Sequence, residues 1–139
     1  MHLFAYGTLM CAELMQEISG CNPPTSVPAT LQGYTRRAVK GLSYPGIFPD
    51  AGGLVQGCLY QDLPDSTWAS LDRFEGEMYA REQVQVALEE GTLLDTLLQA
   101  EVYVVRPEFL HHLDTMDWDF AAFLARYEAY PGISLASEL

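Results

Sequence analysis

The stretch LVQGCLYQDLPDSTWASLDRFEG, residues 54–76, decides the fold because its pattern changes from strand to helix within one segment. Residues 54–63 alternate between two faces, which is typical of a β-strand. Residues 64–76 open with the helix-entry triplet PDS and end at Gly76, a residue type that commonly caps a helix C-terminus. We therefore predict a strand that leads directly into a short helix.

Further strands and helices are indicated on both sides of this segment. Strands are expected at residues 2–6, 25–41, 80–88 and 98–106. Apolar residues at helical spacing predict helices at residues 10–19 and 117–130. Breaks, loops or turns are predicted at GCNPPTSVP (20–28), YPGIFPDAGG (44–53), EEGTLLD (89–95) and Pro131–Gly132.

The order of these elements indicates the fold class. The strands are grouped rather than alternating strictly with helices, which favours an α+β fold. No internal repeat or linker-like composition divides the chain. We predict a single domain over residues 1–139, a small mixed or antiparallel β-barrel of about five to six strands with two to three flanking helices.

Charge and composition restrict the classes of partner. The formal net charge is −12 with only 7 Lys and Arg residues, so no basic stripe is available to bind nucleic acid or an anionic membrane. No apolar run approaches the roughly 18 residues of a membrane span, and the first ten residues do not resemble a secretory signal. The 3 cysteines fit no disulfide framework or metal spacing. We expect a reduced, cytoplasmic protein.

One acidic residue falls on the apolar side of the predicted helix. At about 100° per residue, Glu75 projects between Trp68 and Leu71, which belong to the buried stripe. Burial and the negative end of the helix dipole both disfavour an ionised carboxylate, so each raises its pKa. Such a group suits general-base catalysis near neutral pH. The periodicity is also compatible with a position at the edge of the buried helix face, from which the Glu75 side chain reaches water or pairs with Arg81.

Several short motifs occur in the order found in one known family. They are YGTL at 6–9, YPGI at 44–47, GCLYQDL at 57–63 and LDRFEGEMYAR at 71–81, followed by QVQV. Together they resemble the gamma-glutamylcyclotransferase-like family, in the small-barrel branch with relatives in gamma-glutamylamine breakdown and butirosin biosynthesis. The match covers residues 4 to about 88, and the rest of the chain is compatible with it.

The resemblance implies an enzyme that cyclises the γ-glutamyl group of an amine or peptide and releases 5-oxoproline. The family's catalytic glutamate falls on Glu75, the residue that the helical geometry singles out. The substrate cradle is expected at the corner after the first strand, where backbone N–H groups would hold polar atoms of the substrate. Its residues are Tyr6, Gly7, Thr8 and Leu9. Further substrate-binding residues are expected at Tyr44, Tyr79 and Arg81. The implied reaction needs no metal or organic cofactor.

Other functions stay open at this point. A non-enzymatic protein could keep the same pocket to bind a small metabolite or a partner. Cys11 could act as a nucleophile near a helix start, although a small buried cysteine is the ordinary interpretation. A metal site could be built from His111, His112, Asp114 and Asp117.

The substrate and the assembly are also left open. Basic residues could make a less negative mouth for an anionic substrate, namely Arg36, Arg37, Lys40, Arg73 and Arg81. The leaving amine or peptide is unspecified. A monomer is expected, with a homodimer as the alternative.

Overall fold

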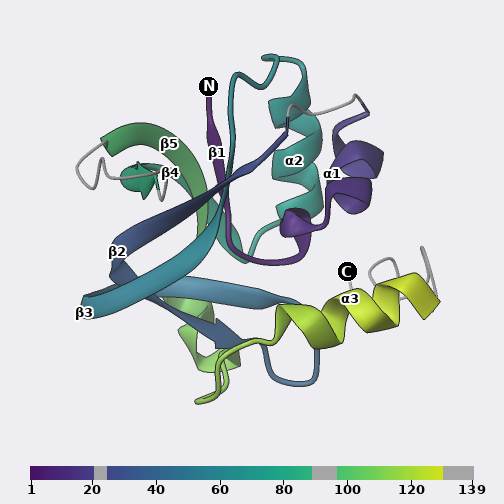
Figure 1. Ribbon diagram of the computed structural model, residues 1–139. Helices are drawn as coiled ribbons and strands as arrows, with labels where there is room; N and C mark the ends of the chain where they lie inside the picture. Colours follow the sequence, from purple (N-terminus) through teal and green to yellow (C-terminus); the bar gives the residue numbers. More distant parts are fainter. Residues whose placement is uncertain (21–24, 89–96, 130–139) are drawn as a thin grey trace.

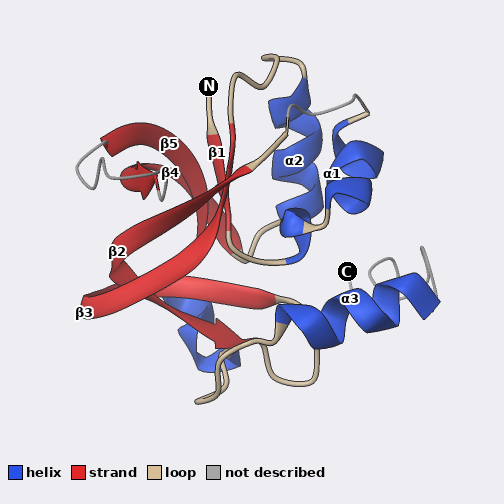
Figure 2. Cartoon of the chain, viewed as in Figure 1, coloured by secondary structure: helices blue, strands red, loops and turns tan. Residues whose placement is uncertain are grey.

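The computed structural model describes residues 1–20, 25–88 and 97–129. Its strands are β1 (Leu3–Ala5), β2 (Val27–Ala38), β3 (Pro45–Tyr60), β4 (Tyr79–Leu88) and β5 (Leu97–Val105). Its helices are α1 (Ala12–Ser19), α2 (Thr67–Glu75) and α3 (Phe120–Ala129), with 3₁₀ helices η1 (Thr8–Met10) and η2 (Pro107–His112). Helices α1 and α2 lie side by side against the barrel, and α3 lies beside the far end of the β2–β3 ribbon (Figures 1 and 2).

The strands close into a barrel in the order β1–β3–β2–β4–β5. Most neighbouring strands are antiparallel, but β1 and β5 are parallel, with Leu3 opposite Glu101. The prediction of a small mixed barrel with flanking helices is therefore confirmed, with five strands among the described residues.

Strand β1 separates two apolar clusters because its side chains alternate between two faces. Phe4 and Tyr6 belong to the cluster that fills the barrel. Leu3 and Ala5 belong to a second cluster that joins the barrel to the helices. Both clusters are well buried, and burial of each large apolar side chain contributes about 1.5–3 kcal/mol. The chain that leaves β1 therefore emerges where the two clusters meet.

The predicted loop at residues 44–53 is largely wrong, because β3 begins at Pro45. Pro45 pairs with Ala38 and Pro49 pairs with Tyr34 across the β2–β3 ribbon. Among the described strands, this part of β3 pairs only with β2, so its other side is an edge, where proline is tolerated. Residues 50–53 lie opposite the shift in register between Gln32 and Tyr34.

The helix boundaries follow their caps. Helix α2 ends as predicted at Gly76, whose φ of 76° is a conformation that glycine adopts without strain. Helix α3 begins at Phe120 rather than at the predicted residue 117, because side chains before it bind backbone N–H groups. Asp117 accepts from the N–H of Trp118, and Asp119 accepts from the N–H of Ala122.

Some predictions concern segments outside the described residues. These are the turn at 89–95, the prolines at 23–24 and the helix end at 131–132. The first helix ends within the described part, at Gly20, which has the left-handed conformation of a C-terminal cap. None of the helices in the described segments has the length and apolar character needed to cross a membrane.

Candidate active site

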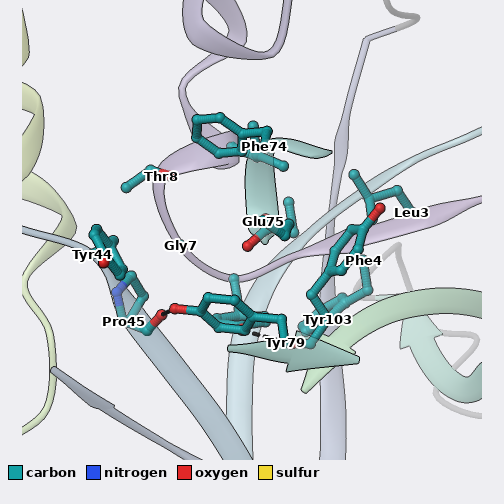
Figure 3. A pocket seen from close by; sticks show the side chains of 13 residues that line it. Leu3, Phe4, Gly7, Thr8, Tyr44, Pro45, Phe74, Glu75, Tyr79 and Tyr103 are labelled. Atoms are coloured by element: carbon teal, nitrogen blue, oxygen red, sulfur yellow. Dashed lines mark hydrogen bonds between the residues drawn. The ribbon is translucent and has the colours of Figure 1, made fainter. Parts of the chain in front are cut away.

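A pocket opens where the chain leaves β1, next to the C-terminal end of α2 (Figure 3). Its lining comprises Leu3, Phe4, Ala5, Tyr6, Gly7, Thr8, Leu9, Tyr44, Pro45, Phe74, Glu75, Tyr79 and Tyr103. This lining contains one carboxyl group and no Lys, Arg or His among the described residues. The pocket is therefore an aromatic and apolar cavity with a single ionisable acid.

That acid is Glu75, the last residue of α2. The side chain is half-buried, and in Figure 3 its carboxyl group points toward the corner that carries Gly7. Burial raises the pKa of Glu75 to about 8, and the negative charge of Asp72 adds to this rise. The predicted rise in pKa is confirmed. A carboxyl group with this pKa can accept and return a proton near neutral pH.

The corner after β1 packs closely against the start of β3. A Cβ on Gly7 would lie 2.7 Å from Cγ of Pro45 and 2.9 Å from its Cδ, so only glycine fits without displacing the proline ring. Thr8 and Leu9 then begin η1 and are buried. The first N–H groups of a helix have no partner within the helix. The corner thus brings polar backbone groups to the edge of an otherwise apolar pocket.

Two tyrosines fix the walls of the pocket through their hydroxyl groups. Tyr6 donates a 2.6 Å hydrogen bond to the carbonyl oxygen of Tyr103, and Tyr79 donates a 2.6 Å bond to that of Pro45. Burial raises the pKa of both phenols well above the ordinary value, so both stay protonated at neutral pH. These side chains join β1 to β5 and β4 to β3, and so hold the pocket open around Glu75.

The structure brings most of the predicted site residues together. The corner Tyr6–Leu9, Tyr44, Glu75 and Tyr79 all line the pocket. Arg81 does not line it. Its Nε lies 3.4 Å from Oδ1 of Asp72, and its guanidinium carbon lies 4.9 Å from the centre of the Trp68 ring. Arg81 therefore contacts α2 from β4 at Asp72 and at the buried Trp68, and not at the pocket.

Sequence analysis missed several residues that shape the pocket. Tyr103 and Pro45 line it. Arg36, which was expected only in a basic mouth, instead binds the carbonyl oxygen of Tyr6 at 2.8 Å and does not line the pocket. The sequence gives no local signal for them, since Tyr103 contacts a residue 97 positions earlier. Phe74 of α2 packs against the apolar cluster that joins the barrel to the helices, and it contributes to the pocket wall as well.

The structure does not support the two alternative sites, a cysteine nucleophile and a metal site. Cys11 is buried in the apolar cluster between the barrel and the helices and does not line the pocket. Asp117 is bound by Arg36, at 2.8 Å between Oδ1 and Nε. Within the described parts of the chain, no group of three or more His, Cys, Asp or Glu side chains is arranged to hold a metal ion.

Comparison with known proteins places the chain in a family. Residues 3–120 match the family described as gamma-glutamyl cyclotransferase, AIG2-like. The chain belongs to this family. Among relatives of this AIG2-like chain, AIG2-like protein C of Arabidopsis thaliana is 34% identical over 84% of the chain and 67% of its own length. AIG2-like protein D of the same plant is 36% identical over 73% of the chain and 65% of its own length.

Solved structures share the fold of this AIG2-like chain. The solution structure of an Arabidopsis thaliana protein has a TM-score of 0.71 at 26% identity, over 92% of this chain and 74% of the other. The crystal structure of an AIG2-like protein from Mus musculus has a TM-score of 0.65 at 25% identity, over 85% and 87%. A structure described as a gamma-glutamyl cyclotransferase has a TM-score of 0.62 at 19% identity, over 99% and 83%, which shows the fold alone. The chain spans about two thirds or less of the length of the curated relatives it matches, 67% of AIG2-like protein C and 58% of Protein AIG2 B.

Proposed function

We propose that this chain is a gamma-glutamyl cyclotransferase that converts a γ-glutamyl amine or peptide into 5-oxoproline and a free amine or peptide. Glu75 is the general acid and base. One observation carries the proposal: a single half-buried carboxyl group, with its pKa raised to about 8, points across an aromatic pocket toward the corner at Gly7. Membership of the AIG2-like cyclotransferase family supports the same assignment.

The reaction is an internal aminolysis. The carboxylate of Glu75 takes a proton from the α-amino group of the substrate, and the freed nitrogen attacks the γ-carbonyl carbon. A carbon–nitrogen bond forms to close the five-membered ring, and the bond from that carbon to the leaving nitrogen breaks. Glu75 returns the proton to the leaving nitrogen, so atoms and charge balance. Because nucleophile and carbonyl belong to one molecule, effective molarities of about 10⁵ M or more are accessible.

The corner after β1 supplies the substrate cradle in this proposal. Backbone N–H groups of Gly7, Thr8 and Leu9 bind polar atoms of the γ-glutamyl group and stabilise the oxyanion that develops at the γ-carbonyl. Tyr44 and Tyr79 form the walls beside it. In this proposal the protein is a monomer that acts on a small molecule in the cytoplasm.

The experiment is a panel of γ-glutamyl amines, amino acids and peptides, with 5-oxoproline release as the readout. The wild-type chain should release 5-oxoproline, with kcat/KM rising as pH passes through about 8. Glu75→Gln, which keeps the shape of the side chain, should lose the activity while keeping a native circular dichroism spectrum. Release that is equal in the two proteins would disprove the role of Glu75.

The same panel separates an enzyme from a binding protein. If no compound gives 5-oxoproline with folded protein, but one of them raises the thermal unfolding midpoint, the pocket is a binding site. In that case Glu75 would bind the α-ammonium group of the ligand rather than move its proton.

A further inference from the structure

Arg36 connects three parts of the molecule that meet behind the pocket. It lies on β2, and its Nη1 donates a 2.8 Å hydrogen bond to the carbonyl oxygen of Tyr6. Its Nε and Nη2 donate to the two carboxylate oxygens of Asp117, at 2.8 and 3.2 Å. The guanidinium carbon lies 5.6 Å from the ring centre of Trp118. Each of the three guanidinium nitrogens thus has a partner.

The bond to Tyr6 fixes one peptide plane of the substrate cradle. The carbonyl of Tyr6 and the N–H of Gly7 belong to the same peptide unit, and in a trans peptide they point in opposite directions. Arg36, which binds this carbonyl, does not line the pocket, so we infer that the carbonyl points away from it. The N–H of Gly7 is thereby turned to the other side, at a residue that lines the pocket.

The next carbonyl groups of the corner are held as well. Gly7 accepts from the N–H of Met10 at 3.0 Å, and Thr8 accepts from that of Cys11 at 3.1 Å. Leu9 accepts from the hydroxyl of Tyr60 at 2.7 Å. Among these carbonyl partners, Arg36 is the one that carries a full positive charge. A charged donor also polarises the Tyr6–Gly7 peptide, which strengthens its N–H as a donor.

The segment before α3 holds Arg36 in this orientation. Main-chain hydrogen bonds join this segment to the end of β2, from Asp114 N–H to Ala38 O at 2.7 Å and from Ala38 N–H to Met116 O at 2.9 Å. This pairing places the Asp117 carboxylate beside Arg36. The hydrogen bond from Arg36 lowers the pKa of Asp117 despite an opposing effect of burial, so the pair is ionised at neutral pH.

We propose that Arg36 is a positioning residue of the cyclotransferase site, held by Asp117, which sets the Tyr6–Gly7 peptide so that the Gly7 N–H donates to the substrate. This inference rests on the proposed function for its catalytic consequence. Its structural part, the control of the Gly7 amide, does not depend on turnover.

The kinetic test compares Arg36→Lys and Arg36→Gln with the matched control Arg37→Gln. Lysine keeps the charge but cannot bind a carboxylate in two places and a carbonyl at once. For a γ-glutamyl compound that the wild-type chain cyclises, both Arg36 variants should lose about tenfold to a hundredfold in kcat/KM, mainly in kcat. Arg37, the next residue on β2, lies over the Phe48 ring at 5.8 Å, and its variant should stay within twofold of wild type.

Two further readouts distinguish positioning from general damage. The pH dependence of kcat/KM should keep the same apparent pKa in Arg36→Gln, because Arg36 does not contact Glu75. Asp117→Asn should lose less activity than Arg36→Gln, and the double variant should be no worse than Arg36→Gln alone, since the two residues act through one contact.

The structural test uses nuclear magnetic resonance of the substrate-free protein. The amide resonance of Gly7 should shift in Arg36→Gln and Asp117→Asn far more than that of Gly52, which has no neighbouring atoms at its Cβ position. An unchanged Gly7 resonance would disprove the inference, and so would Arg36→Gln activity within twofold of wild type. If no γ-glutamyl compound is turned over, the proposed function fails, while the Gly7 resonance still decides the role of Arg36.

Discussion

The hydroxyl of Tyr103 donates a 2.7 Å hydrogen bond to Oδ1 of Asp72, one helical turn before Glu75. Residues three apart in a helix are surface neighbours, so the two carboxyl groups of α2 lie close together. Arg81, on β4, approaches the same Asp72 oxygen at 3.4 Å. Asp72 is thus bound by a pocket residue, Tyr103, and paired with a cation that does not line the pocket, beside the proposed catalytic acid.

Asp72→Asn should lower the pKa of Glu75. The change removes the negative charge that helps to raise this pKa, while asparagine still accepts the hydrogen bond from Tyr103. The pKa should stay above the ordinary value because burial is the larger cause. A ¹³C titration of the Glu75 carboxyl group measures the shift directly. Asp65→Asn, an exposed site just before α2, is the control, and equal titration curves for the two variants would contradict the prediction.

The stability of the fold should depend on pH through Glu75. Its pKa is raised from 4.5 to about 8 by folding, so the folded state favours the protonated form. The stabilisation from Glu75 is therefore complete below pH 4.5 and is lost as pH rises through 8. Glu75→Gln cannot ionise. Its free energy of unfolding relative to wild type should rise by more than about 1 kcal/mol between these limits and then level off. Urea unfolding at a series of pH values measures this difference, and a constant difference would exclude the raised pKa.

Gly7→Ala should destabilise the corner that carries the proposed cradle. The added methyl group would displace the ring of Pro45. The main-chain carbonyl of the same residue accepts the hydrogen bond from Tyr79. We expect a loss of about 1–3 kcal/mol, as for other overpacked sites, together with slower 5-oxoproline release. Gly52→Ala is the matched control because nothing lies within 4 Å of its Cβ position, and it should change stability by less than about 0.5 kcal/mol. Chemical denaturation of both variants tests this, and similar losses would refute the role of the Gly7–Pro45 contact.

Added salt should favour substrates whose leaving group is anionic. The chain has a net charge of −12, and the described pocket lining has no basic side chain to pair with a carboxylate. Repulsion between exposed charges weakens as the Debye length falls from about 30 Å at 0.01 M to about 8 Å at 0.15 M salt. Over this range kcat/KM for a γ-glutamyl peptide should rise severalfold, while that for a γ-glutamyl alkylamine should change less than twofold. A larger salt effect on kcat/KM for the γ-glutamyl alkylamine would show that the charge of the leaving group does not affect the reaction rate.

Local patterns were sufficient to predict α2 and to place Glu75 beside its buried stripe, although they left open a position at the edge of the buried helix face for the carboxyl group. Helical periodicity acts over a few residues, and the cap at Gly76 is a property of one residue type. The start of β3 was missed because proline is normally a signal against strands. Here Pro45 and Pro49 lie on an edge, where they pair with β2 on one side only. The sequence of β3 alone does not indicate that this part of the strand is an edge.

Contacts between distant segments set the remaining features of the site. Tyr79 and Arg81 share a face of β4, yet two residues along a strand is a step of about 6.6 Å. That step takes Arg81 past the pocket and over Trp68. Tyr103 and Arg36 reach the corner after β1 from strands that only the closed barrel brings together.

The parallel pairing of β1 with β5 has a consequence for how the protein is made. Strand β1 leaves the ribosome before the other described strands, but one of its neighbours in the ring is β5, which ends at Val105. Pairing strands so far apart in sequence requires a loop-closure cost that local contacts do not, so we expect the ring to close late in folding. The Tyr6–Tyr103 bond that braces the pocket forms in the same step. A nascent chain that has not yet released β5 therefore has the Tyr6–Leu9 corner but no assembled pocket, and activity should appear only once synthesis has passed β5.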